Sequence, residues 1–254
     1  MKRAQLMLVS ALIAASALAA TAPGAFALRG QVRSNSDGFG TSCVGFVDTY
    51  PQQLYSLTVT QMSKLGFAVA DSSIGSTFTR NAFLSTVLHD YAVYVHSHGD
   101  DYWASAGYPK IDSGFLQDPG PGRCNNSSDI VRSSSIKAAT LGTPYNLVIM
   151  STCFLGSDKS TMPGAFQIEK TKTSNQPEFY LSYVGHVYDS SMLRFEKAFW
   201  SYINSGNPAY SLWGAFTYAN SLGGYASPDF DNPFMPNWWG SANYNGHPTA
   251  PTSW

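Results

Sequence analysis

A histidine and a cysteine, each placed just after a short apolar run, are the residues of this chain best suited to chemistry. His98 follows the apolar stretch 92–95 and precedes Gly99, and Cys153 follows the apolar stretch 147–150. A thiolate is a strong nucleophile toward a carbonyl carbon. An imidazole titrates near neutral pH and can exchange the protons of such a reaction. The two residues together predict nucleophilic acyl chemistry.

Both residues must lie at the same edge of one sheet if they are to act together. The chain alternates apolar runs with segments whose apolar residues have helical spacing, which is typical of a parallel α/β sheet with helices on both faces. We expect strands at 43–47, 67–70, 91–95, 147–150 and 179–184, and helices at 52–65, 79–89, 130–141, 192–203 and 211–222. Ligands bind such sheets at the carboxyl ends of the strands. The pattern therefore predicts a three-layer α/β/α sandwich with a mostly parallel central sheet and a site at those ends.

The amino-terminal segment has the pattern of an export signal. Lys2 and Arg3 precede an apolar run, and residues 25–27 form a small-x-small cleavage motif. The apolar run is short for a membrane-spanning helix. We expect residues 1–27 to be a signal peptide, 28–42 a flexible leader and 43–254 one domain. The protein is then secreted or periplasmic, without stable insertion in a membrane.

Composition and charge restrict the partners. Removing Lys2 and Arg3 from the 15 basic side chains leaves 13 against 16 acidic ones, a net charge of −3. No basic patch stands out, so we expect no nucleic-acid partner. Metal-binding spacings such as His-Glu-x-x-His or Cys-x-x-Cys do not occur, so we expect neither a metal nor a cofactor. We also expect a monomer.

The cysteine count bears on the state of Cys153. The chain has three cysteines, and an odd number in an exported protein leaves at least one unpaired thiol. Cys43 opens an expected strand and Cys124 lies in a polar loop. We expect these two to form a disulfide and Cys153 to be free, although the count alone allows three pairings.

Taken in order, the motifs resemble the caspase–hemoglobinase fold of cysteine peptidases. The cysteine comes 55 residues after the histidine, and the spacing in caspases is about 50 residues. Residues 151–156, Ser-Thr-Cys-Phe-Leu-Gly, are similar to the Ser-Ala-Cys-x-x-Gly of CHAT-type and gingipain-like members and depart from the caspase Gln-Ala-Cys-x-Gly. Residues 179–222 resemble the strand, Asp-Ser step and amphipathic helix that follow the cysteine in those groups. Gly246-His-Pro-Thr weakly resembles the Gly-Asp-Pro-Thr of gingipain-like domains. The resemblance covers roughly residues 43–250.

The resemblance implies a role for individual residues. Cys153 would be the nucleophile, and His98 would protonate the leaving amine without forming a tight ion pair with the thiol. The N–H groups of Gly99 and Cys153 would form the oxyanion hole. The pocket for the residue before the scissile bond would be formed by Asp48, Ser151, Gly185, His186 and Asp189. Because the segments after the first and fifth expected strands offer acids and no arginine, we expect a preference for Arg or Lys at that position.

Other interpretations of the same residues stay open. Cys153 could be a core residue, and His96 competes with His98 for the catalytic role, although only His98 is followed by glycine. Asp48 and Asp189 could simply cap the helices that follow them. The main hypothesis is a secreted cysteine endopeptidase with a caspase-like domain. The first alternative is a catalytically inactive exported binding or surface protein on the same fold, and the second is an amidase or transpeptidase with the same dyad.

Overall fold

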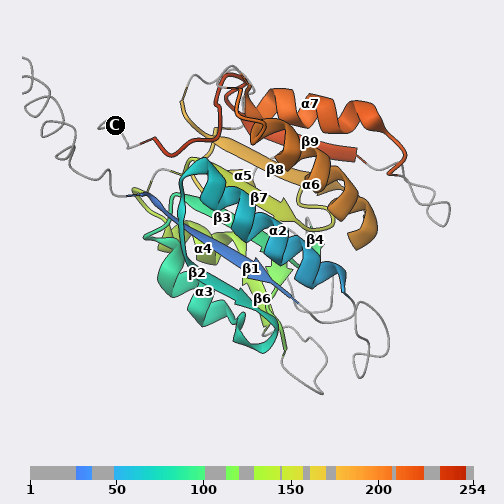
Figure 1. The fold of residues 1–254 in the computed structure, drawn as a ribbon. Coiled ribbons are helices and arrows are strands. Elements are labelled where there is room, and N and C mark those ends of the chain that lie inside the picture. Colours follow the sequence, from blue (N-terminus) through green and yellow to red (C-terminus); the bar gives the residue numbers. More distant parts are fainter. Residues whose placement is uncertain are drawn as a thin grey trace, which may run out of the picture.

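A six-stranded sheet lies at the centre of the protein and has the order β2-β1-β3-β7-β8-β9 (Figure 1). The computed structural model describes residues 27–35, 49–100, 113–119, 129–143, 145–156, 161–169, 176–207, 210–225 and 235–249. The strands of this sheet are β1 (Arg29–Ser34), β2 (Ala68–Ile74), β3 (Ala92–His96), β7 (Leu147–Ser151), β8 (Phe179–Val184) and β9 (Met235–Gly240). Only the β8–β9 pair is antiparallel among the pairs of this sheet. The predicted α/β sandwich with a mostly parallel sheet is therefore confirmed.

Helices cover both faces of the sheet (Figure 1). One face packs against α2 (Tyr50–Leu65), α6 (Asp189–Ile203) and α7 (Leu212–Leu222), and the other packs against α3 (Arg80–Val87), α4 (Ser133–Ala139) and α5 (Thr161–Ala165). Strand β3 serves both layers, because Ala92 and Tyr94 point to the first face while Val93 and Val95 point to the second. Alternate side chains of a strand point to opposite faces, so a central parallel strand is apolar throughout.

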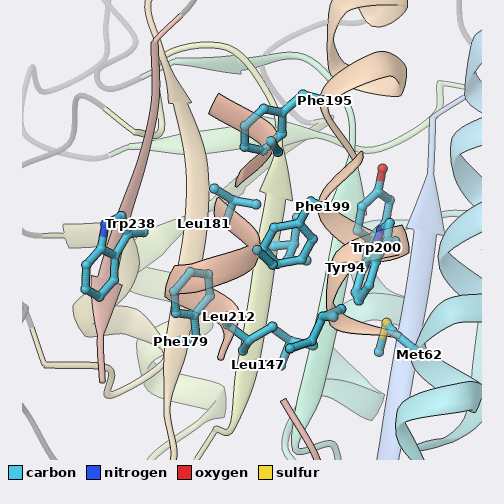
Figure 2. Packing of buried hydrophobic residues seen from close by; sticks show 14 of the residues in the cluster. Met62, Tyr94, Leu147, Phe179, Leu181, Phe195, Phe199, Trp200, Leu212 and Trp238 are labelled. Carbon is cyan, nitrogen blue, oxygen red and sulfur yellow. The ribbon is translucent and has the colours of Figure 1, made fainter. Parts of the chain in front are cut away.

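Helix α6 anchors the first layer through aromatic side chains. Phe195, Phe199 and Trp200 are fully buried and lie between the helix and the sheet, next to Leu181 and Tyr94 (Figure 2). Burying one such side chain stabilises a fold by about 1.5–3 kcal/mol. This packing fixes the position of the start of α6, which lies beside the candidate site.

The segment expected as a flexible leader, 28–42, contains a strand, β1. Residues 29–34 form a strand between β2 and β3, and all but its first residue are buried. The apolar pattern missed it because its buried side chains are largely polar and bond to one another. Arg33 donates to Gln31 Oε1 at 2.9 Å and to Ser73 Oγ at 2.7 Å. A buried polar strand of this kind is stable when its hydrogen bonds are satisfied.

Several other boundaries differ from those expected. The segment expected as one helix over 130–141 is divided into β6 (Ile130–Arg132) and α4. Strand β6 joins β4 (Gly99–Asp100) and β5 (Gly114–Leu116) in a small antiparallel sheet. The expected strand at 43–47 and nearly all of the signal peptide lie outside the described residues. Within the described part of the chain, no helix is long and apolar enough to cross a membrane.

The order of the strands predicts a ligand-binding site at one edge of the sheet. The chain passes from β1 to β2 on one side and then returns to β3 on the other, so the direction of winding reverses between β1 and β3. Open α/β sheets bind ligands outside the carboxyl ends of the strands at such a reversal. β3 leads to His98 there, and its neighbour β7 leads to Cys153.

Candidate active site

Gly99 brings the ends of β3 and β7 into direct contact. The two strands pair in parallel up to His96 and Ser151. Beyond them, a Cβ on Gly99 would lie 2.6 Å from the carbonyl oxygen of Cys153 and 2.8 Å from Oγ1 of Thr152. Only a residue without a side chain fits so close to a neighbouring backbone. The His-Gly step and the cysteine turn therefore meet at the same edge of the sheet.

The turn that carries the cysteine is tight and strained. The N–H of Leu155 donates to the carbonyl of Cys153 at 2.8 Å, which closes a three-residue turn. Phe154 at its centre has a φ of 60°, in the left-handed region that disfavours residues other than glycine. Such a conformation costs on the order of 1–3 kcal/mol and is found preferentially at functional sites.

The loop after β8 holds this turn in place. The N–H of Phe154 donates to the carbonyl of Gly185 at 3.0 Å, and the Phe154 ring meets the His186 ring edge to face at 4.6 Å. The N–H of Val187 donates to Sγ of Cys153 at 3.4 Å, and the thiol lies 3.6 Å from the Val187 carbonyl. Cys153 is a free thiol and is partly exposed. Its sulfur therefore has a fixed position next to the loop at 185–189.

His96, the competitor for the catalytic role, lies below the surface. It is fully buried, and its Nε2 is 3.2 Å from Oδ1 of Asp189. On its other side, Nδ1 is 3.2 Å from Oγ of Ser34, which donates to the carbonyl of Pro51. His98 is partly exposed instead. Exposure therefore favours His98 as the histidine that meets a substrate.

Burial keeps both candidate catalytic groups neutral. Desolvation lowers the pKa of His98 from 6.5 to about 4, with Asp189 opposing this effect and His96 adding to it. Desolvation also raises the pKa of Cys153 from 9.0 to about 11, and the charges of Asp189 and Asp100 contribute in the same direction. A buried site disfavours the charged form of each group. Burial therefore favours the thiol form of Cys153 and the neutral imidazole of His98 at neutral pH.

The N–H of Gly99, one of the two expected oxyanion donors, is not used by the small sheet. It pairs with Phe115 in the small sheet, and the adjacent hydrogen bond runs from the N–H of Leu116 to the carbonyl of His98. Gly99 is therefore at a non-hydrogen-bonded position of the ladder, where the N–H points away from the partner strand. The second expected donor is the N–H of Cys153, which also stabilises its own thiolate.

The predicted pocket residues are only partly brought together. Gly185 and His186 lie against the cysteine turn, as the contacts with Phe154 show. Ser151 is fully buried and donates to Glu196 Oε1 at 2.6 Å, so its side chain lies in the interior and not beside the cysteine turn. β7 alternates its side chains, which directs Ser151 into the layer below α6. Asp189 is only 8% exposed and faces His96, which leaves it poorly placed to hold a substrate side chain.

A buried carboxyl group under the site was missed in the sequence. Glu196 of α6 is fully buried and accepts hydrogen bonds from Ser151, from Tyr183 at 3.0 Å and from Tyr94 at 2.9 Å. These three donors belong to β7, β8 and β3. The available signal was the position of Glu196 within the apolar stripe formed by Met192, Phe195, Phe199 and Trp200. A charged residue in such a stripe indicates a buried polar network.

Some of the sequence predictions concern residues outside the part of the chain that the structure describes. Asp48, Cys43 and Cys124 lie outside the described residues. The disulfide between the two cysteines therefore remains a prediction. Among the described residues, no three of His, Cys, Asp and Glu are grouped so that they could hold a metal ion.

Comparison with known proteins adds no family. No protein-family model matches the chain, and no curated protein matches it.

Proposed function

We propose that this protein is an exported cysteine endopeptidase in which Cys153 is the nucleophile and His98 the general base and acid. The contact of Gly99 with Thr152 and Cys153 is the observation that carries the proposal. It joins a His-Gly step to a strained cysteine turn at the carboxyl ends of two parallel neighbours. The sequence resemblance to caspase–hemoglobinase peptidases supports the same assignment.

Acylation of the enzyme starts from the neutral pair. The imidazole of His98 takes the thiol proton while Sγ of Cys153 attacks the peptide carbonyl carbon, and the carbonyl oxygen becomes an oxyanion. The N–H groups of Gly99 and Cys153 stabilise that oxyanion. The intermediate collapses as the C–N bond breaks, and the leaving amine takes its proton from His98. The products are a free amine and a thioester on Cys153.

Water completes the cycle. His98 takes a proton from water as the hydroxyl oxygen adds to the thioester carbonyl carbon. The C–S bond then breaks, the acid product leaves, and the thiolate of Cys153 recovers the proton from His98. The expected preference for Arg or Lys needs an acidic side chain in the pocket. Asp189 faces His96, so a preference for Arg or Lys would depend on Asp48 or on Asp100, whose charge acts on Cys153.

A peptide library tests the proposed function. Purified wild-type protein should cleave internal peptide bonds, and Cys153→Ala and His98→Ala should each reduce kcat/KM by at least about 10³-fold. Lys197→Ala, on the exposed side of α6, is the control and should match the wild type. Equal turnover by the wild type and Cys153→Ala would refute the peptidase, and the alternative of an inactive exported binding protein would then be favoured. Release of ammonia or a transpeptidation product without hydrolysis of the peptide chain would favour the amidase or transpeptidase.

A further inference from the structure

Asp189 and His96 form a buried pair between the end of β3, which leads to His98, and the loop at 185–189, which contacts Cys153. His96 ends β3, two residues before His98, and Asp189 begins α6, two residues after Val187. The two side chains are 3.2 Å apart, and neither is more than 8% exposed. One end of the 185–189 loop is therefore fixed to the strand that carries His98.

The same loop contacts the nucleophile at its other end. Val187 exchanges hydrogen bonds with Sγ of Cys153, and the carbonyl of Gly185 accepts from Phe154. A shift of α6 away from β3 would move these contacts as well. Displacements of about 1 Å at a catalytic group can reduce rates by about 100-fold.

The His96 side of the pair is also held by a contact with β1. Ser34 of β1 meets Nδ1 of His96, and the strand register places Ser34, His96 and Ser151 in one row across β1, β3 and β7. Ser151 in turn bonds to Glu196, seven residues after Asp189 on α6. Both ends of this row are therefore linked to neighbouring elements, and the His96 ring has a fixed orientation.

We propose, on the basis of the cysteine peptidase function above, that Asp189 and His96 are a positioning pair. The pair fixes the loop that holds Cys153 and places an anion near the imidazole of His98. Asp189 then acts on the reaction through its neighbours and does not bind the side chain of the substrate. This role differs from the pocket role that the sequence suggested for Asp189. It also gives the buried histidine a function.

The charges around the two reacting groups define what the pair changes. Asp189 raises the pKa of His98 and His96 lowers it. Asp189 and Asp100 both raise the pKa of Cys153. Replacing Asp189 by asparagine removes an anion from both groups while the shape of the side chain is kept. The thiol of Cys153 should then ionise at lower pH, and the protonated form of His98 should be less stable.

The experiment compares Asp189→Asn, His96→Gln, His96→Ala and the double variant Asp189→Asn/His96→Gln in the full-length protein. On peptides with Arg, Lys or Leu before the scissile bond, Asp189→Asn should reduce kcat by about 10- to 100-fold for all three with KM little changed. His96→Gln keeps a polar side chain beside Asp189 and should retain more activity than His96→Ala. The double variant should be no worse than the poorer single one, because the two residues act as a unit. Lys197→Ala is the control.

A second readout does not depend on peptidase activity. Alkylation of Cys153 by iodoacetamide at pH 8 should be about 3- to 10-fold faster in Asp189→Asn than in the wild type. If the wild type cleaves no peptide, the proposed function fails while this readout still tests the pair. An unchanged alkylation rate overturns the proposal, as does a rise in KM that is confined to the Arg and Lys peptides. If Asp189→Asn does not fold, His96→Ala, which removes the partner of Asp189, tests the pair instead, and a kcat equal to that of the wild type overturns the proposal.

Discussion

The hydroxyl of Ser151 donates to the carboxylate of Glu196 at 2.6 Å, which joins β7 to α6 two residues before the candidate nucleophile. Tyr94 and Tyr183 donate to the same carboxylate from β3 and β8. The three strands that lead to His98, Cys153 and the loop at 185–189 are therefore connected to one helix through one side chain. Burial raises the pKa of Glu196, while the three hydroxyl donors oppose this effect.

Replacement of Glu196 should weaken the fold beneath the site. Glu196→Ala leaves three buried hydroxyl groups without their acceptor, and we expect it to lower the free energy of unfolding by about 3–5 kcal/mol. Glu196→Gln keeps one acceptor oxygen and should cost less. Urea denaturation measures both variants, with Lys197→Ala as the control on the exposed side of the same helix. Equal midpoints for Glu196→Ala and Lys197→Ala would show that the network adds no stability.

Gly99 offers a direct test of the contact between the two strand ends. An added methyl group in Gly99→Ala would meet the carbonyl of Cys153 and the side chain of Thr152. We expect kcat to fall by about 100-fold or more, because the cysteine turn or the His-Gly step must move. Gly164→Ala is the matched control, since a Cβ at Gly164 meets no atom within 4 Å. Activity in Gly99→Ala equal to that of the control would contradict the proposed geometry.

The parts of the fold that could be predicted are those whose burial is purely apolar. The strands expected at 91–95, 147–150 and 179–184 match β3, β7 and β8 within one residue at each end. They are central or nearly central and are buried on both faces, so each is a near-continuous apolar run. The positions of His98 and Cys153 at one sheet edge follow from these strands.

The parts that could not be predicted depend on polar or irregular packing. β1 is a central strand, yet Arg33 and Gln31 are buried through hydrogen bonds, so its sequence resembles a surface loop. β9 contains proline and asparagine and was not expected as a strand. It is held by antiparallel pairing with β8 and by the stacking of Trp238 on Phe179 at 5.5 Å. The buried roles of Ser151 and Asp189 likewise depend on α6, whose first turn the apolar pattern did not include.

Asp90, at the opposite end of the sheet, should make stability depend on pH. Its side chain is fully buried, with Nε of Arg29 at 3.6 Å. Desolvation, with a smaller contribution from Asp71, raises its pKa from 3.8 to about 7. A carboxyl group whose pKa is raised by folding favours the folded state at low pH, and this contribution is lost as the pH rises from about 4 to about 7.

Asp90→Asn removes this titration. We expect the variant to gain stability relative to the wild type as the pH rises from 4 to 7, with a change on the order of 4 kcal/mol at most. Urea denaturation of both proteins at a series of pH values measures the difference, so that other titrating groups cancel. A difference that stays constant over this range would mean that Asp90 is already ionised at pH 4 in the folded protein.

The thiol of Cys153 should react slowly in the absence of substrate. Burial raises its pKa from 9.0 to about 11. The thiolate fraction at pH 8 and below is then about 100-fold smaller than that of an ordinary thiol. We expect alkylation by iodoacetamide to be at least about that much slower than alkylation of free cysteine, and to increase about tenfold for each pH unit up to pH 9. Mass spectrometry of the peptide that contains Cys153 measures the rate.

The pH dependence of the same reaction separates two forms of the dyad. A neutral pair gives a rate that rises steadily with pH, because only the small thiolate fraction reacts. A thiolate–imidazolium pair would instead give rapid alkylation at pH 6–7 that is lost in His98→Ala. Rapid, His98-dependent alkylation at neutral pH would contradict the neutral resting state and would mean that His98 already holds the thiol proton before the substrate binds.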